Sequence, residues 1–427
     1  MAWLGRRKLA FIPLSRTNIE PPDVIPPDWP GQIMRRLFFD PATDPITDDP
    51  IPGTDRSVRA YFHTVSSGLA DLDVIVLPAQ TIAEENVPPD ALEATMGTQL
   101  RSEGFVGAAI VMLGGPGGGS TSQLSDFAWS RFSMSDDLGV WVGEILHQTN
   151  LCDLPDLFDF AGQYPSGENM GPFDQEAGYQ ATHLSAWTKR AVRWLDPSTV
   201  ARHRGGVADY DLHSVSLIQP PPTGRIAAVQ IGAAVPYLMV EARLQADQFD
   251  VNIPNEGVIV YRVQTTDPLG NAQHDAAPLA LLTKTALTAG QSFTTDGVTI
   301  GVGEAVLGGG FAIKVSMGVG IPIIVWYNSN TGETQIWFMD SNTLAGRATV
   351  VDQNGPALVG PPFSIVGVGD FNQDGNADLV WYNSNTGETQ IWFMDGNTLA
   401  GRATVVDQNG PALVGPPFSI VGVGSSH

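Results

Sequence analysis

A glutamate and a histidine stand three residues apart in residues 139–147, and this spacing can support zinc chemistry. Zinc-dependent peptide hydrolysis uses two histidines at positions i and i+4 of one helical face. A glutamate directly after the first histidine polarises the zinc-bound water. Glu144 and His147 have this spacing, but Gly143 stands where the first histidine belongs. The segment therefore predicts Glu144 as general base and His147 as zinc ligand, in a site that lacks one imidazole.

The motifs around this helix resemble, in order and spacing, the immune inhibitor A family of secreted bacterial metallopeptidases. The family shows a serine-and-aromatic motif, the zinc helix followed by Leu-Pro-Asp-Leu-Tyr-Asp, a methionine turn, a helix with a lysine, and two later strand motifs. The resemblance covers roughly residues 7–317 and is carried by residues 57–68, 139–159, 167–171, 182–197, 237–243 and 249–261.

The resemblance implies a zincin-like fold and assigns roles to further residues. The third zinc ligand of the family is an acidic residue shortly after the second histidine. Asp153 fits by spacing, because it lies six residues after His147. Asp156 fits better by its place in the motif Leu-Pro-Asp-Leu-Phe-Asp. We prefer Asp153 and keep Asp156 as the alternative. Met170 matches the methionine that forms the floor of the zinc site.

Several segments have patterns that predict the surrounding elements. Residues 8–14 and 71–77 are typical of strands, and residues 105–113 of a buried central strand. Residues 15–56 are rich in proline and aspartate, which favours an extended surface excursion. Residues 182–194 have apolar positions at helical spacing.

Composition limits the classes of partner. The chain has 427 residues, a formal charge of −23 and a pI near 4.4, which argue against binding to nucleic acid or to anionic membranes. No apolar run reaches the roughly 20 residues that span a bilayer. The first residues are basic but no apolar core of a signal peptide follows, so export is inferred from the resemblance. Cys152 is the only cysteine, which excludes an intrachain disulfide and favours a small buried residue.

The last part of the chain is an internal repeat. Residues 325–369 and 380–424 have the same 45-residue text at an offset of 55, and they differ only at Ser341 and Gly396. Each copy predicts short strands and resembles the FG-GAP or VCBS type of propeller repeat. Four tryptophans recur in the copies, and they could stack on sugars, although packing between blades is the favoured interpretation: Trp326, Trp337, Trp381 and Trp392.

Between the copies, Asp-Phe-Asn-Gln-Asp-Gly-Asn-Ala-Asp has the pattern of a calcium loop. Oxygen ligands stand at alternate positions and a glycine allows the sharp turn. The predicted ligands are the side chains of Asp370, Asn372, Asp374 and Asp378 and the backbone carbonyl of Asn376.

These observations predict an α+β chain that ends in an all-β part. A zincin-like metallopeptidase domain over residues 1–265 is followed by a small β module over 266–317 and by two propeller-blade-like repeats over 318–427. The predicted protein is extracellular or at the cell surface, and it is a pseudoprotease or a weakly active zinc endopeptidase with a calcium-binding tail. Its substrates would be proteins or peptides. The alternative is a non-enzymatic, calcium-dependent binding or adhesion protein that uses the repeats to bind glycan or protein.

Overall fold

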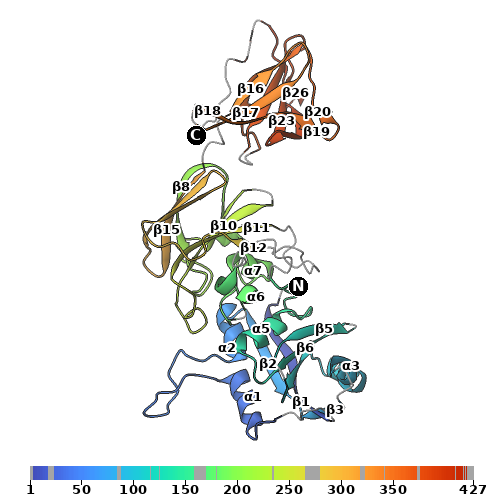
Figure 1. Cartoon of the computed structure of the whole chain (residues 1–427), viewed down its shortest axis with the longest axis vertical. Helices are drawn as coiled ribbons and strands as arrows, with labels where there is room; N and C mark the ends of the chain where they lie inside the picture. Colours follow the sequence, from blue (N-terminus) through green and yellow to red (C-terminus); the bar gives the residue numbers. More distant parts are fainter. Residues whose placement is uncertain are drawn as a thin grey trace.

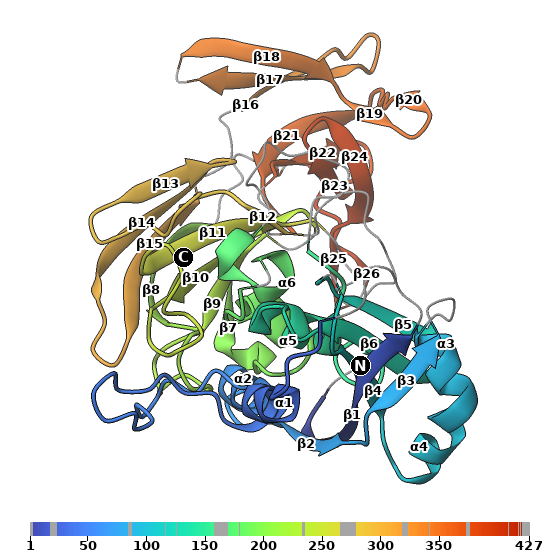
Figure 2. The same cartoon turned by 60° about the horizontal axis from the view of Figure 1, so that its bottom comes forward.

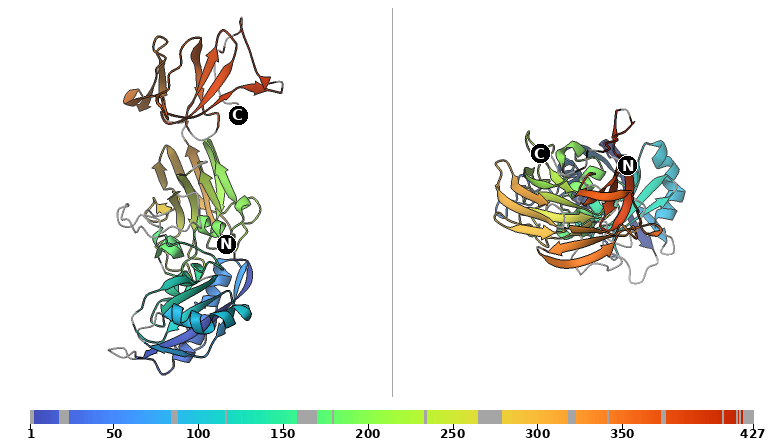
Figure 3. Two further views of the ribbon diagram at one scale, coloured as in Figure 1. Left: turned by 90° about the vertical axis from the view of Figure 1, so that its right-hand side faces the viewer. Right: turned by 90° about the horizontal axis from the view of Figure 1, so that it is seen from above.

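The computed structural model arranges the chain as three strand-rich parts that follow one another along the longest axis (Figures 1 and 3). It describes residues 3–17, 24–83, 88–115, 117–124, 126–157, 170–178, 180–232, 235–264, 279–317, 323–340, 342–372, 376–408, 410–416, 418 and 420. In this described part, no helix combines the length and the apolar character that crossing a bilayer requires.

The first part is a mostly parallel sheet with helices on both faces. Its central strand β4 (Gly107–Met112) is buried along its whole length, as the apolar run 105–113 predicts. The sheet order is β2-β1-β4-β6-β5, and β3 pairs with the far end of β1. The other strands are β1 (Gly5–Thr17), β2 (Ala70–Val76), β3 (Gln80–Ala83), β5 (Ser120–Leu124) and β6 (Phe127–Ser133).

Two apolar clusters fix the helices to this sheet. On one face Phe11, Phe62 and Trp141 join the sheet to α2 (Val58–Val65) and α5 (Leu138–Leu146). On the other face Leu92 and Leu100 cover Trp129. The helices of this part also include α1 (Trp29–Phe38), α3 (Pro88–Leu92), the π-helix η1 (Glu93–Gly97) and α4 (Thr98–Ser102). Helix α1 lies within residues 15–56, so a helix interrupts the extended excursion that was predicted there.

The second part is a pair of facing sheets. Their shared core includes Val240, Val260, Ile300 and Ile313. One sheet has the order β12-β11-β10-β9-β7 and the other β13-β14-β15-β8. The strands are β7 (Val200–His203), β8 (Gly206–His213), β9 (Ala228–Ile231), β10 (Tyr237–Arg243), β11 (Gly257–Val263), β12 (Leu279–Leu281), β13 (Ser292–Thr295), β14 (Val298–Ala305) and β15 (Gly310–Met317).

Both sheets are assembled across the boundary expected at residue 265. Strand β12 pairs with β11, and β15 pairs with β8 over its whole length. The strands of residues 279–317 therefore complete sheets that begin earlier in the chain.

Short helices connect the first two parts and pack under β10 and β11. Phe173 and Trp187 pack there against Ile259 and Tyr261. These helices are the 3-10 helix η2 (Gly171–Phe173), α6 (Gln175–Gly178), α7 (Ala186–Ala191) and the 3-10 helix η3 (Pro197–Thr199). The helix expected over residues 182–194 is thus shorter, because Ser185 caps its start by accepting a hydrogen bond from Thr188 N.

The repeats form two sheets. Strands β16, β17 and β18 of the first copy form one of them. The other has the order β20-β19-β24-β23-β22-β21, so β19, β20 and β21 of the first copy join strands of the second copy there (Figure 2). A separate hairpin, β25-β26, ends the described strands. The bounds are β16 (Ile323–Tyr327), β17 (Thr334–Asp340), β18 (Thr343–Thr349), β19 (Val351–Asp352), β20 (Gly355–Pro356), β21 (Phe363–Gly369), β22 (Asp378–Asn383), β23 (Thr389–Asp395), β24 (Thr398–Thr404), β25 (Val406–Asp407) and β26 (Gly410–Pro411).

Candidate functional site

Helix α5 positions the two residues of the zinc-type motif at its C-terminal end. Glu144 lies in the last turn, and His147 is the residue that caps the helix. Every residue of the helix except Val140 is buried, so the helix is enclosed by the sheet and by α2 and α6. Gly143, in the place of the first histidine, is one of these buried residues.

Glu144 is almost enclosed and is held in place by a hydroxyl group. Thr121 Oγ1 lies 2.7 Å from Glu144 Oε2 and donates a hydrogen bond to it. The chain passes over the carboxylate at Gly119, where a Cβ atom would collide with Glu144 Oε1. Burial raises the pKa of Glu144, and His147 and Thr121 counteract only part of this effect. A raised pKa suits a general base, but the enclosure leaves little room for a water molecule.

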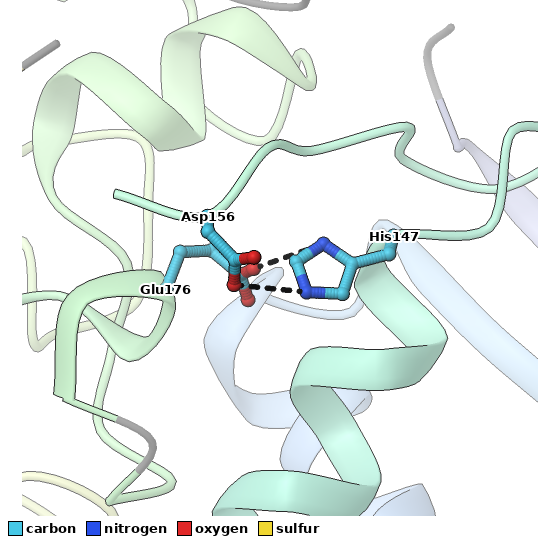
Figure 4. Close-up of side chains that lie close together, drawn as sticks. All are labelled: His147, Asp156 and Glu176. Carbon is cyan, nitrogen blue, oxygen red and sulfur yellow. Dashed lines mark ion pairs between the residues drawn. The ribbon is translucent and has the colours of Figure 1, made fainter. Parts of the chain in front are cut away.

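The two ring nitrogens of His147 face two carboxylates, those of Asp156 and Glu176 (Figure 4). Its Nε2 is 3.3 Å from Asp156 Oδ1, and its Nδ1 is 3.4 Å from Glu176 Oε2. The Nδ1 atom is also 2.7 Å from the carbonyl oxygen of Leu154. Burial would lower the pKa of His147, but the negative charges of Glu176 and Asp156 outweigh burial and raise this pKa to about 10.

Glu176 is a member of this cluster that the sequence analysis did not predict. It comes from α6, and its side chain is fully buried. Neither of its carboxylate oxygens has a hydrogen-bond partner among the described residues. Burial raises the pKa of Glu176 well above its usual value, and the nearby His147 reduces the effect. The signal in the sequence was only an acidic pair, Asp174 and Glu176, shortly after Met170.

The structure separates the two candidates for the third ligand. Asp156 reaches His147, whereas Asp153 is not among the residues that gather there. The backbone of Asp153 has a φ of 55°, which marks a sharp turn after the helix. Met170 is buried in one core with Leu157 and Phe173, and its role below a zinc site stays a prediction.

The cluster has a donor set that metals use. One ligand atom from each of His147, Asp156 and Glu176 can be chosen so that all lie within 4.8 Å of one another. Imidazole and carboxylate groups are both zinc ligands, and a buried carboxylate without hydrogen bonds is consistent with such a role. Without a metal, the imidazole of His147 pairs with the carboxyl groups of Asp156 and Glu176. His183 does not join the cluster, since it is bonded in the core to Asp247 and Lys189.

The structure describes the first and the last residues of the predicted calcium loop. Asp370, Asn372, Asn376 and Asp378 lie in the described part, whereas Asp374 lies outside the described residues. Asp378 is fully buried at the start of β22. Its Oδ2 accepts a hydrogen bond from Phe371 N at 2.8 Å, and its Oδ1 accepts one from Met394 N at 2.9 Å. Asp378 therefore ties the loop to the second blade.

The four repeat tryptophans are not equivalent. Trp381 and Trp392 are buried in the core between the two copies. Trp326 is 51% exposed. Trp381 and Trp392 therefore pack between the blades. Stacking on a sugar is possible only for the tryptophans of the first copy.

Comparison with known proteins agrees with the assignment of the repeats. Residues 363–406 match the family model of the FG-GAP repeat, and these residues form β21 to β24. No curated protein is similar enough to the chain to count as a relative. Neither comparison supports the resemblance of residues 7–317 to immune inhibitor A.

Proposed function

We propose that this chain is an exported binding protein of the adhesion type, without enzymatic activity, that binds its partners through the repeats. The observation that carries the proposal is the FG-GAP repeat at residues 363–406. Repeats of this family often mediate protein binding and occur in extracellular or surface proteins. The first part of the chain serves as a scaffold.

Calcium is proposed to order the loop that precedes the second blade. Asp370, Asn372, Asp374 and Asp378 offer side-chain oxygens, and Asn376 offers its backbone carbonyl. Asp378 already links the loop to strand β23, because it accepts hydrogen bonds from Phe371 N and Met394 N. An ion in this loop would hold the strand before it and the strand after it in one arrangement, and binding through the blades would then depend on calcium.

The environment of Glu144 also favours a scaffold over a peptidase. The helix offers a glycine where a histidine ligand is needed, and a zinc site for catalysis uses three protein ligands and one open position. Glu144 is fixed by Thr121 and covered by Gly119. Few directions remain from which a peptide bond could approach it.

Calcium titration of the full chain tests the proposal. We expect calcium to raise the thermal midpoint of the repeats, because an ion bound only to the folded state stabilises that state. Asp370→Ala should remove the shift, whereas Asp395→Ala, an exposed acid outside the loop, should retain it. The labelled chain should bind intact bacterial cells or their isolated surface glycans and proteins in calcium and dissociate in a chelator. Absence of a calcium-induced shift, or binding that ignores the chelator, would contradict calcium-dependent adhesion.

A second candidate function is a weak metallopeptidase of the immune inhibitor A type. The cluster of His147, Asp156 and Glu176 favours it, because Glu176 could take the place of the missing imidazole beside His147 and Asp156. Such a metal would polarise a carbonyl or a water molecule, and Glu144 would accept the proton. Zinc affinity should rise with pH, since the imidazole of His147 must lose its proton before it binds the metal.

Zinc binding and casein hydrolysis distinguish the two functions. The comparison needs the unchanged chain, Glu144→Ala, Glu176→Gln, Gly143→His, and Gly143→His with Glu144→Ala. Hydrolysis by the unchanged chain that is lost in Glu144→Ala would establish the peptidase. Zinc bound without hydrolysis, and lost in Glu176→Gln, would support a metal site in a protein that is not a peptidase.

A further inference from the structure

The two copies of the repeat already form one junction within the chain, and its contacts show how a blade receives its neighbour. The hairpin β19-β20 of the first copy adds to the edge of β24 in the second, where Val351 pairs with Thr398. Val351 N donates to the carbonyl oxygen of Asn397 at 3.0 Å. Asn397 Nδ2 donates in return to the carbonyl oxygen of Thr349 at 2.9 Å.

Apolar side chains close the same junction. Ile336, Val350 and Ala357 of the first copy lie in one core with Trp381 and Trp392 of the second. The Tyr327 ring meets the Trp381 ring edge to face, with centroids 5.2 Å apart. A hairpin on one copy thus acts as the donor, and an edge with a tryptophan pair on the other copy acts as the acceptor.

The acceptor surface of the first copy is open. Strand β18 is an edge strand of its sheet among the described residues. Trp326, the counterpart of the fully buried Trp381, is 51% exposed, and Ile324 beside it is 42% exposed. The tryptophan pair is nevertheless already formed, since the rings of Trp326 and Trp337 are 5.1 Å apart and those of Trp381 and Trp392 are 5.0 Å apart.

The donor hairpin of the second copy is open as well. Hairpin β25-β26 pairs only with itself in the described part of the chain. Residues 405–414 repeat the text of residues 350–359 without a change. Val406 is 65% exposed, whereas its counterpart Val351 is half-buried. Tyr382, the counterpart of Tyr327, is already buried, so the difference in exposure lies at Val406 of the hairpin and not on the face of β22.

We propose that a second copy of this chain docks head to tail, with the β25-β26 hairpin of one chain on the β18 edge of the next. Val406 N would donate to the carbonyl oxygen of Asn342, and Asn342 Nδ2 to the carbonyl oxygen of Thr404, as their counterparts do within the chain. Trp326 and Ile324 become covered in the same step. The proposal goes beyond calcium-dependent binding and needs neither calcium nor zinc.

The junction joins unlike surfaces, and this constrains the assembly. Such an interface generates a ring if the rotation per chain closes and a filament if it does not. Rings of propeller blades contain about four to eight blades, so about two to four copies of this pair of blades would complete one ring.

Sedimentation of the full chain tests the proposal with variants that block one surface each. We expect the unchanged chain to form a defined oligomer of two to four chains. Val406→Asp should remove the donor and Trp326→Glu the acceptor, and each variant should weaken association at least about tenfold. Val207→Asp is the matched control, because Val207 is also 65% exposed but lies in β8.

Mixing the two blocked variants gives the decisive observation. The Val406→Asp chain keeps its acceptor and the Trp326→Glu chain keeps its donor, so the mixture should form heterodimers with one junction and nothing larger. Asn342→Ala provides a second acceptor variant if Trp326→Glu fails to fold. A full chain that stays monomeric at about 100 µM overturns the proposal, since that range still detects weak interfaces. Oligomers that ignore both blocking substitutions, or blocked variants that do not recombine, also overturn it.

Discussion

The two copies of the repeat have almost the same sequence but not the same environment. Trp381 is enclosed by its neighbour, and Trp326 faces solvent at the corresponding position. Val350 is buried, whereas Val405 is only half-buried. Because the two copies have the same local sequence, the neighbouring copy determines which of the corresponding side chains is buried.

Other features are the same in both copies and are therefore set locally. The tryptophan pairs have nearly equal separations. Tyr327 donates its hydroxyl hydrogen to the Val359 carbonyl at 2.7 Å, and Tyr382 makes the same bond to Val414 at 2.7 Å. A blade thus forms its internal contacts alone, as expected for repeats that contact only their neighbours.

The largest expected difference between the copies concerns their central tryptophans. Trp381→Ala should lower the free energy of unfolding of the repeats by about 3–5 kcal/mol, because it leaves a cavity in the shared core. Trp326→Ala removes a half-exposed ring and should cost less than about 1 kcal/mol. Urea unfolding of the full chain, under dilute conditions that dissociate oligomers, measures both. Equal losses would show that the neighbour does not determine the difference.

The loop carboxylate should have the next largest effect. Asp378→Ala removes the acceptor of two backbone hydrogen bonds, from Phe371 N and Met394 N. We expect a loss of about 2–3 kcal/mol even in a calcium chelator, because buried donors are left unsatisfied. The exposed Asp395→Ala should change the free energy of unfolding by less than about 0.5 kcal/mol. A loss for Asp378→Ala that appears only in calcium would mean that the carboxylate acts through the ion alone.

The two tyrosine hydroxyls should have equal effects. Tyr327→Phe and Tyr382→Phe each remove one hydrogen bond to a backbone carbonyl and should each cost about 1 kcal/mol. This pair checks the part of the comparison that is local. A difference of more than about 1 kcal/mol between the two variants would show that the junction also changes the internal contacts of a blade.

The smallest expected effect on stability is the difference between Asn397→Ala and Asn342→Ala, which change corresponding residues of the two copies. Asn397→Ala loses the hydrogen bond to Thr349 across the junction and should cost about 0.5–1 kcal/mol. Asn342→Ala should leave the dissociated chain unchanged and weaken its self-association. Unfolding and sedimentation of both variants measure the two effects separately. A loss of stability in the dissociated Asn342→Ala chain would contradict the open acceptor.

The sequence predicted local features well and distant contacts poorly. The offset of the repeats, the strand at residues 105–113 and the spacing of Glu144 and His147 are patterns within one element. Glu176 could not be predicted, because its place beside His147 depends on how α6 packs against α5. Spacing favoured Asp153 over Asp156, but a backbone turn with positive φ at Asp153 brings Asp156 to the histidine.

The pairing of β8 with β15 was beyond prediction for the same reason. The two strands are separated by more than ninety residues, and either pattern would fit several partners. The predicted domain boundary at residue 265 therefore falls between strands that share a sheet. Helix α1 was missed because proline and aspartate dominate the surrounding text, although Trp29-Pro-Gly-Gln-Ile-Met is a helix start with proline at its first turn.

The junction between β19 and β24 has a consequence for how such a protein can evolve. Each 55-residue unit carries one donor hairpin and one acceptor edge. When a whole unit is gained or lost, the array still has one acceptor edge at its first unit and one donor hairpin at its last. The change therefore exposes no additional core. The length of the array can therefore drift between related lineages while each intermediate still folds, and selection can act on the number of binding surfaces without first repairing the fold.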